Sequence, residues 1–207
     1  MRILALTFVF ALAQHAPAYA DPALDRIFDL KQLETIESGK SVTYSHIRSS
    51  GIGEALPDIN EGKITLAIEG EETRTAVLEL TDGKRSRRLE DFPGDGGNPV
   101  LMAFLEMVTR AVSRGTGGSP FYIRNRIKDA FSRGTPIEDA EDGDQIVYRP
   151  FERETTKDRL GAFSGLELVF VLDEKAPGGF RKLHAKSGKN GDGYRELIDL
   201  TPEEDAQ

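Results

Sequence analysis

Histidine and cysteine are the residues whose spacing most often reveals a metal centre or a nucleophile, and this chain offers few of them. It has no cysteine, which excludes a disulfide framework, a thiolate nucleophile and sulfur-ligated metals. Beyond the first 20 residues its histidines are His46 and His184, and neither belongs to an HExxH or comparable metal-binding spacing. The sequence therefore predicts neither a metal centre nor a cofactor.

Three short segments have a partial likeness to catalytic or ion-binding motifs, and each fails on detail. Residues 94–99 are Gly-rich, but Pro99 stands where a dinucleotide fingerprint needs glycine, and no Walker lysine follows. Ser164 comes one place too late in residues 161–165 for a nucleophile elbow. The acidic residues 138–144 lack the ligand order of a calcium loop. We therefore expect a protein without catalytic activity, with a carboxylate-based hydrolase as the less favoured alternative.

The segment from 100 to 112 is apolar around most of a helical circumference, so a helix there must be buried on more than one side. Its methionines are unbranched and polarizable, which suits a variable apolar surface, and Gly-rich segments flank it. The candidate ligand-binding residues are Met102, Leu105, Met107, Val108 and Tyr122. The alternative is that this helix is simply the hydrophobic core.

The densest positive cluster consists of Lys84, Arg85, Arg87 and Arg88, in a chain whose formal net charge is −8. As a binding patch it would suit anionic lipid headgroups, lipopolysaccharide or an acidic partner protein. The alternative is a solvated edge strand, because charged side chains keep sheet edges from pairing with other chains. The overall negative charge argues against nucleic acid as a partner, since counterion release needs a surface rich in lysine and arginine.

The first 20 residues have the order of a secretory signal. Arg2 precedes an apolar run, residues 3–13, and the small-residue ending of residues 18–20 follows. The apolar run is shorter than the ~20 residues that a membrane-spanning helix needs. We expect cleavage after Ala20 and export to a bacterial periplasm, with residues 21–207 forming a single soluble domain and no later transmembrane segment.

Hydrophobic periodicity predicts the elements that would position these residues. Apolar residues at spacings of three and four predict an amphipathic helix over 22–37, and two further helices are expected over 99–112 and 120–132. Alternating patterns predict the strands 41–49, 63–69, 74–81, 84–89, 145–149, 166–172, 180–185 and 194–200. The strand at 166–172 is apolar on both faces, so we expect it to be central and covered on both sides. The acidic segment 138–144 is expected to be a solvated loop.

This order of elements predicts an α+β fold with a mainly antiparallel sheet. We expect the sheet to be curved, with an N-terminal helix and an inserted helical hairpin that fills its concave side.

Two segments, GNPVLMAFLE at 97–106 and GGSPFYIRNRI at 117–127, resemble exported alphaproteobacterial proteins of unassigned function. That resemblance implies a periplasmic address and supplies no activity and no catalytic residues. Separately, a curved sheet with helices in its mouth is similar to the LolA-like architecture of periplasmic lipoprotein carriers. This second similarity concerns architecture alone, which by itself does not give function.

The sequence therefore favours a non-catalytic periplasmic protein that holds an apolar or amphiphilic envelope molecule between sheet and helical hairpin. The partner would be an envelope lipid or a periplasmic protein. The alternative function is a structural or protein-interaction domain of the cell envelope.

Overall fold

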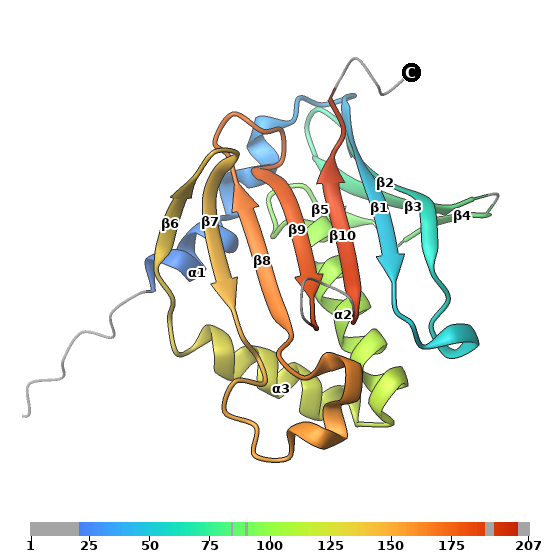
Figure 1. Cartoon of the computed structure of the whole chain (residues 1–207). Coiled ribbons are helices and arrows are strands. Elements are labelled where there is room, and N and C mark those ends of the chain that lie inside the picture. The colour runs from blue at the N-terminus through green and yellow to red at the C-terminus, as the bar shows by residue number, and fades with distance from the viewer. Residues whose placement is uncertain (1–20, 84, 90, 189–192, 203–207) are drawn as a thin grey trace, which may run out of the picture.

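The computed structural model describes residues 21–83, 85–89, 91–188 and 193–202, which form an α+β fold around one large sheet (Figure 1). The strands are β1 (Ser41–Ser49), β2 (Ile59–Glu69), β3 (Thr75–Asp82), β4 (Arg85–Arg88), β5 (Phe92–Pro93), β6 (Ile137–Ala140), β7 (Gly143–Tyr148), β8 (Glu167–Leu172), β9 (Phe180–Lys186) and β10 (Arg195–Leu200). Neighbouring strands are antiparallel in the order β4-β3-β2-β1-β10-β9-β8-β7-β6, and β5 also pairs with β3. The predicted fold class is confirmed.

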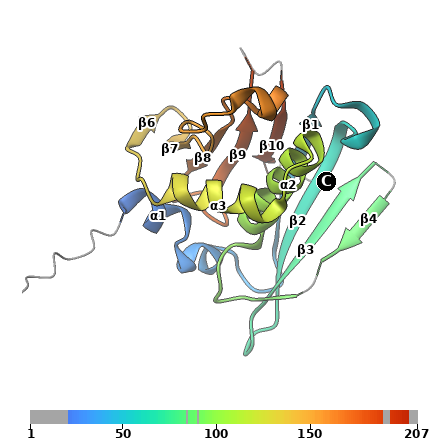
Figure 2. The ribbon, with the colours of Figure 1, turned by 90° about the horizontal axis from the view of Figure 1, so that it is seen from below.

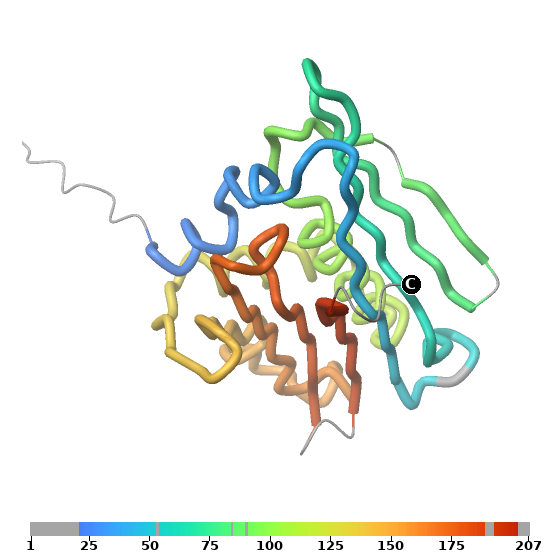
Figure 3. Tube along the Cα trace, turned by 90° about the horizontal axis from the view of Figure 1, so that it is seen from above, coloured from blue at the N-terminus to red at the C-terminus, as the bar shows by residue number. Residues whose placement is uncertain are grey.

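The first and the last described strand of the chain pair with each other in the middle of the sheet. β1 pairs with β10 in a register that places Tyr44 opposite Leu200 and His46 opposite Ile198. The strands that precede the long helices therefore form one half of the sheet, and those that follow them form the other. Figure 3 shows these halves set at an angle, with α2 (Pro99–Thr116) between them.

The other α-helices lie on the same face of the sheet as α2 (Figure 2). They are α1 (Pro22–Ile27) and α3 (Pro120–Phe131), and the 3-10 segments are η1 (Leu30–Thr35), η2 (Gly53–Ala55) and η3 (Lys157–Phe163). The predicted N-terminal helix and the helical pair between strands are thus present. The opposite face of the sheet carries no α-helix within the described part of the chain (Figure 1).

Local sequence explains where α2 begins and ends. The Asn98 side chain accepts a hydrogen bond of 2.9 Å from the backbone N–H of Val100, and Pro99 supplies a φ angle suited to a first helical turn. At the other end Gly117 has φ 68°, the left-handed conformation that most often stops a helix and that glycine adopts without strain. α3 starts three residues later at Pro120.

The hydrophobic core fills the space between the sheet and the helical pair. Phe104, Val108 and Val112 of α2 are fully buried, as is Phe170 of β8. The rings of Phe104 and Phe170 meet edge to face, with centroids 6.0 Å apart. Side chains therefore fill the space between sheet and helical hairpin, where the sequence predicts a ligand.

The predicted helix over 22–37 is wrong in its extent, because it is two short elements. α1 ends at Ile27, and η1 starts afresh after Asp29, whose carboxylate accepts a hydrogen bond of 2.9 Å from the backbone N–H of Lys31. Aspartate competes in this way with a continuous helix, since its side chain satisfies backbone groups that the helix would otherwise use. The break turns Phe28 outward, where it is 38% exposed.

Two other expectations are corrected at the far half of the sheet. The acidic segment 138–144 is a hairpin of β6 and β7 and not a loop; β6 is an edge strand whose residues are all exposed, so its acids stay hydrated. β8 is interior to the sheet, as expected, but helices cover only one of its faces. On the other face Val169 is shielded by its cross-strand neighbours Val147 and His184.

Candidate functional site

An apolar groove lies in the wedge between α2 and α3, on their solvent side. Its volume is about 310 Å³. The residues that line this helix groove are Phe28, Met102, Leu105, Glu106, Thr109, Arg124, Ile127, Lys128 and Phe131. Two of the predicted ligand-binding residues, Met102 and Leu105, are therefore part of it.

Helical periodicity builds the floor of the groove. Met102, Leu105 and Thr109 follow one another at spacings of three and four on α2, and Ile127 and Phe131 do so on α3. Thr109 donates its hydroxyl hydrogen to the backbone oxygen of Leu105 at 2.8 Å, which satisfies that donor within the helix. The floor is consequently apolar although it contains a hydroxyl.

Phe28 closes the end of the helix groove. Its ring meets that of Phe131 edge to face, with centroids 5.8 Å apart. Met102, which lines the groove together with these two aromatic residues, is 53% exposed. The groove thus offers an open apolar surface and not a sealed cavity.

The rim of the groove is positively charged. Glu106 accepts hydrogen bonds from Arg110 Nε at 2.7 Å and from Arg124 at 2.9 Å. Burial by itself would raise the pKa of Glu106, but these two guanidinium groups outweigh it and hold the pKa below its ordinary value. Lys128 forms no ion pair with any residue that the structure describes. Arg110 and Arg124 therefore share one carboxylate, and Lys128 adds a third positive charge to the rim.

The structure does not bring the five predicted ligand-binding residues together. Val108 is fully buried in the core, and Met107 is half-buried and packed against it. Tyr122 lines a separate pocket of about 290 Å³ between the α2–α3 connection and η3, where its hydroxyl donates to Glu154. Met102 and Leu105 remain as groove residues.

Sequence reasoning missed the aromatic and cationic members of the groove. Phe28 had been placed inside a continuous helix, so nothing indicated that it would turn towards α3. Arg124 and Lys128 are four residues apart, as are Ile127 and Phe131, and that i, i+4 pattern on the second predicted helix is a signal that could have pointed to them.

The basic cluster lies on the edge strand β4, as predicted, but it is not one patch. Lys84 lies outside the described residues. The register places Arg85 opposite Asp82 and Arg87 opposite the partly buried Leu80, on the helix side of the sheet, whereas Arg88 lies on the other side. Arg88 also forms ion pairs with Asp91 at 2.9 Å and Glu69 at 3.8 Å.

A buried carboxylate is the best candidate for the hydrolase alternative. Glu196 is fully buried beneath the helices, and Tyr194 and Arg48 donate to its Oε2 at 2.7 Å each. His46 Nε2 lies 2.5 Å from its Oε1, and Arg48 donates to the same atom at 2.9 Å. Both oxygens are saturated with internal partners, which favours a structural role for this cluster over proton transfer to a substrate.

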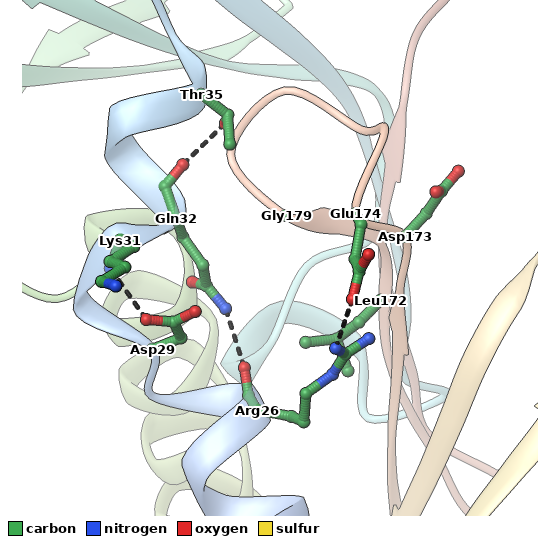
Figure 4. Close-up of a pocket in the computed structure, with 9 residues that line it drawn as sticks. All are labelled: Arg26, Asp29, Lys31, Gln32, Thr35, Leu172, Asp173, Glu174 and Gly179. Carbon is green, nitrogen blue, oxygen red and sulfur yellow. Dashed lines mark hydrogen bonds and ion pairs between the residues drawn. The ribbon is translucent and has the colours of Figure 1, made fainter.

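A polar pocket of about 240 Å³ lies between η1 and the β8–β9 connection (Figure 4). Arg26, which lines this pocket, forms ion pairs with Glu174 at 2.7 Å and with Asp144 at 2.6 Å. Gly179 has φ 77°, and a Cβ there would come within 2.8 Å of Gln32 Cγ, so glycine permits the close approach of the two segments. These contacts fasten the N-terminal helices to the sheet.

Comparison with known proteins adds no family: no protein-family model, curated protein or solved structure matches the chain. No group of three His, Asp or Glu side chains within the described ranges is arranged to hold a metal ion. The described helices include none with both the length and the apolarity needed to cross a membrane. The similarity to LolA-like carriers stays a prediction.

Proposed function

We propose that this chain is an exported, non-catalytic binding protein of the periplasm that holds the acyl chain of an anionic amphiphile in the helix groove. The observation that carries the proposal is the open apolar floor around Met102 and Phe28 with a cationic rim directly above it. Ligand pockets are typically apolar with a few polar groups that fix orientation, and about 310 Å³ is at the small end of their range.

Burial of the exposed floor would supply the binding energy. Met102 and Phe28 are 53% and 38% exposed, and covering these fractions stabilises a complex by about 1 kcal/mol each. Each further methylene of the ligand that leaves water adds about 0.8 kcal/mol. A single acyl chain therefore suits the groove better than a polar metabolite of the same size.

The rim would select the headgroup. Arg110, Arg124 and Lys128 leave a positive surplus over Glu106, in a chain whose net charge is −8. Exposed charge pairs contribute at most about 1 kcal/mol each, so the rim gives orientation and selectivity more than affinity. A carboxylate or phosphate headgroup fits this charge. The signal-like residues 1–20 support a periplasmic location for such a ligand.

Titration with a fluorescent, carboxylate-bearing fatty-acid analogue tests the proposal. The parent protein should bind the probe saturably, and Met102→Glu should weaken binding by at least about tenfold, because it places a charge on the apolar floor. Phe121→Glu is the matched control: Phe121 is 71% exposed on α3 and is not part of the groove lining. The control should bind as the parent does.

The rim has its own arm of this experiment. The double variant Arg124→Gln, Lys128→Gln should bind the carboxylate probe more weakly than the parent does. Its binding of a neutral analogue of equal chain length should be unchanged. Absence of saturable binding by the parent would reject the lipid proposal. The alternative would then be an apolar helix of a partner protein, which also fits a groove between two helices.

A further inference from the structure

Another pocket lies on the helix-free face of the sheet, at one end of β8, β9 and β10. It has a volume of about 560 Å³ and polar walls. The residues that line this sheet pocket are Gly165, Glu167, His184, Lys186, Ser187, Gly188 and Arg195. None of them belongs to the helix groove, which lies on the opposite face.

Strand register brings the charged side chains of the sheet pocket into one row. Lys186 of β9 stands opposite Glu167 of β8 on one side and Arg195 of β10 on the other. His184 lies two residues before Lys186 on the same face, with Val169 and Leu197 as its cross-strand neighbours. Rigid, hydrogen-bonded strands therefore hold the polar groups in place.

The row carries more positive than negative charge. Glu167 is engaged by Arg149, whose Nε and terminal nitrogen lie 2.9 and 2.7 Å from Oε1, and by Lys186 Nζ at 3.5 Å from Oε2. Arg195 forms no ion pair with any described residue. Three cations thus lie around one carboxylate, and no acidic side chain of the described ranges occupies the donors of the Arg195 guanidinium.

His184 is affected both by its burial and by this surplus. Its Nε2 is buried and has no hydrogen-bond partner among the described residues. Burial lowers the pKa of His184, and Arg195, Lys186 and Lys182 lower it further, to about 4, although Glu167 acts in the opposite sense. The imidazole is therefore neutral at pH 7, where one of its nitrogens still carries a hydrogen to donate.

We propose that the sheet pocket binds an oxyanion of the phosphate class, held by Arg195 and Lys186 with His184 as a neutral N–H donor. Arginine presents a planar fork of donors that matches phosphate oxygens, and charge-assisted hydrogen bonds are the stronger ones. In the tautomer that carries its hydrogen on Nε2, an anion also supplies the partner that this buried nitrogen lacks among the described residues. The phosphate could belong to a free monoester or to a phospholipid headgroup.

His184 itself reports binding. NMR titration of the imidazole signals should be run at constant ionic strength, with chloride replaced stepwise by inorganic phosphate. The pKa of His184 should rise by about one unit as phosphate saturates, because a bound anion favours the imidazolium. His46, enclosed with Glu196 on the other face, serves as the internal control and should not respond.

Two variants separate a built site from general charge effects. Arg195→Gln should weaken phosphate binding by about tenfold, since it removes a charge-assisted hydrogen bond. Arg87→Gln removes an exposed cation from the distant edge strand β4 and should leave the phosphate response unchanged. The proposal would be overturned if phosphate raised the pKa of His184 equally in Arg195→Gln and in the parent. It would also be overturned if chloride without phosphate gave the same rise.

Melting at pH 7 gives a second readout that does not depend on protonation. Phosphate should raise the melting temperature of the parent and of Arg87→Gln equally, and that of Arg195→Gln by less, because a ligand of the native state stabilises it by mass action. Glycerol phosphate and vesicles containing phosphatidic acid distinguish the two sources. A rise in melting temperature with either ligand supports the oxyanion site. If neither ligand nor inorganic phosphate raises the melting temperature, the proposal is overturned.

Discussion

The side-chain amide of Asn98 donates a hydrogen bond of 2.8 Å to the backbone oxygen of Gly178, while its oxygen caps α2. One buried residue thereby joins the start of the longest helix to the β8–β9 connection, 80 positions further along the chain. Since α2 supplies one wall of the helix groove, the groove depends on this joint.

Removing the joint should destabilise the fold. We expect Asn98→Ala to lower the free energy of unfolding by about 2–3 kcal/mol, because it removes a helix cap and leaves a buried carbonyl without a partner. Asn98→Ser retains a capping oxygen and loses the donor, so it should lie between the parent and Asn98→Ala. Urea denaturation measures all three, and equal midpoints would contradict the role of this residue.

The start of the domain makes a further prediction. Asp21 accepts a hydrogen bond of 3.1 Å from the backbone N–H of Ala23 and one of 3.2 Å from the Tyr148 hydroxyl, so α1 keeps its cap if the chain begins there. N-terminal sequencing of protein from the periplasmic fraction should find Asp21 first. Recovery of a cytosolic pool that begins with Met1 would refute export with cleavage after Ala20.

The strand pattern could be predicted from sequence because alternation has a direct cause in this fold. One face of the sheet packs against helices, so residues such as Ile64, Leu66 and Ile68 on β2 are buried at every second position. β6 was missed because Glu138 and Asp139 leave it no apolar face, and an exposed edge strand needs none. Its identity depends on pairing with β7, which periodicity does not encode.

The candidate sites were less predictable for a related reason. Met102 could be singled out as a flexible apolar residue, but its distinction from Val108 on the same helix depends on how α3 crosses α2. His184 was considered only as a histidine without a metal-binding spacing, and Lys186 and Arg195 were not singled out, because the register of β9 and β10 is what brings the three together. Neither helix crossing nor strand register follows from local composition.

The buried Glu196 cluster should control stability at acidic pH. Burial acts to raise the pKa of Glu196, but hydrogen bonds from His46 and Arg48 outweigh it, so the folded-state pKa lies below the ordinary 4.5. A carboxyl whose pKa is lower in the folded chain than in the unfolded chain stabilises the fold at any pH above the unfolded-state pKa. This contribution is lost as the pH falls below 4.5 and through the folded-state pKa. Urea midpoints measured from pH 6 to pH 3 should show this loss.

Two substitutions compare the contribution of this buried cluster to stability with that of an exposed ion pair. Glu196→Gln leaves Arg48 partly buried without a counterion and should destabilise the fold by about 3–5 kcal/mol. Glu106→Gln, at the exposed rim of the helix groove, should cost less than about 1 kcal/mol. If the two variants unfold at the same urea concentration, the buried network does not contribute as described.

His184 predicts a second acid-sensitive range. Its folded pKa of about 4 lies below the ordinary value of 6.5, so the unfolded chain takes up a proton first as pH falls. Stability should therefore decline between pH 6.5 and pH 4, by at most about 1.4 kcal/mol per pH unit for one proton. His184→Gln should flatten this part of the curve, and an unchanged slope would show that other groups titrate there.

Met102 and Phe104 test whether the helix groove is open surface or core. They are two residues apart on α2, yet Met102 is 53% exposed and Phe104 is fully buried. Met102→Ala should change the free energy of unfolding by less than about 1 kcal/mol and should weaken binding of the fatty-acid probe. Phe104→Ala should lower stability by about 3–5 kcal/mol, because it leaves a cavity beside Phe170. A loss of several kcal/mol in Met102→Ala, with no change in probe binding, would place Met102 in the core and remove the groove as a binding site.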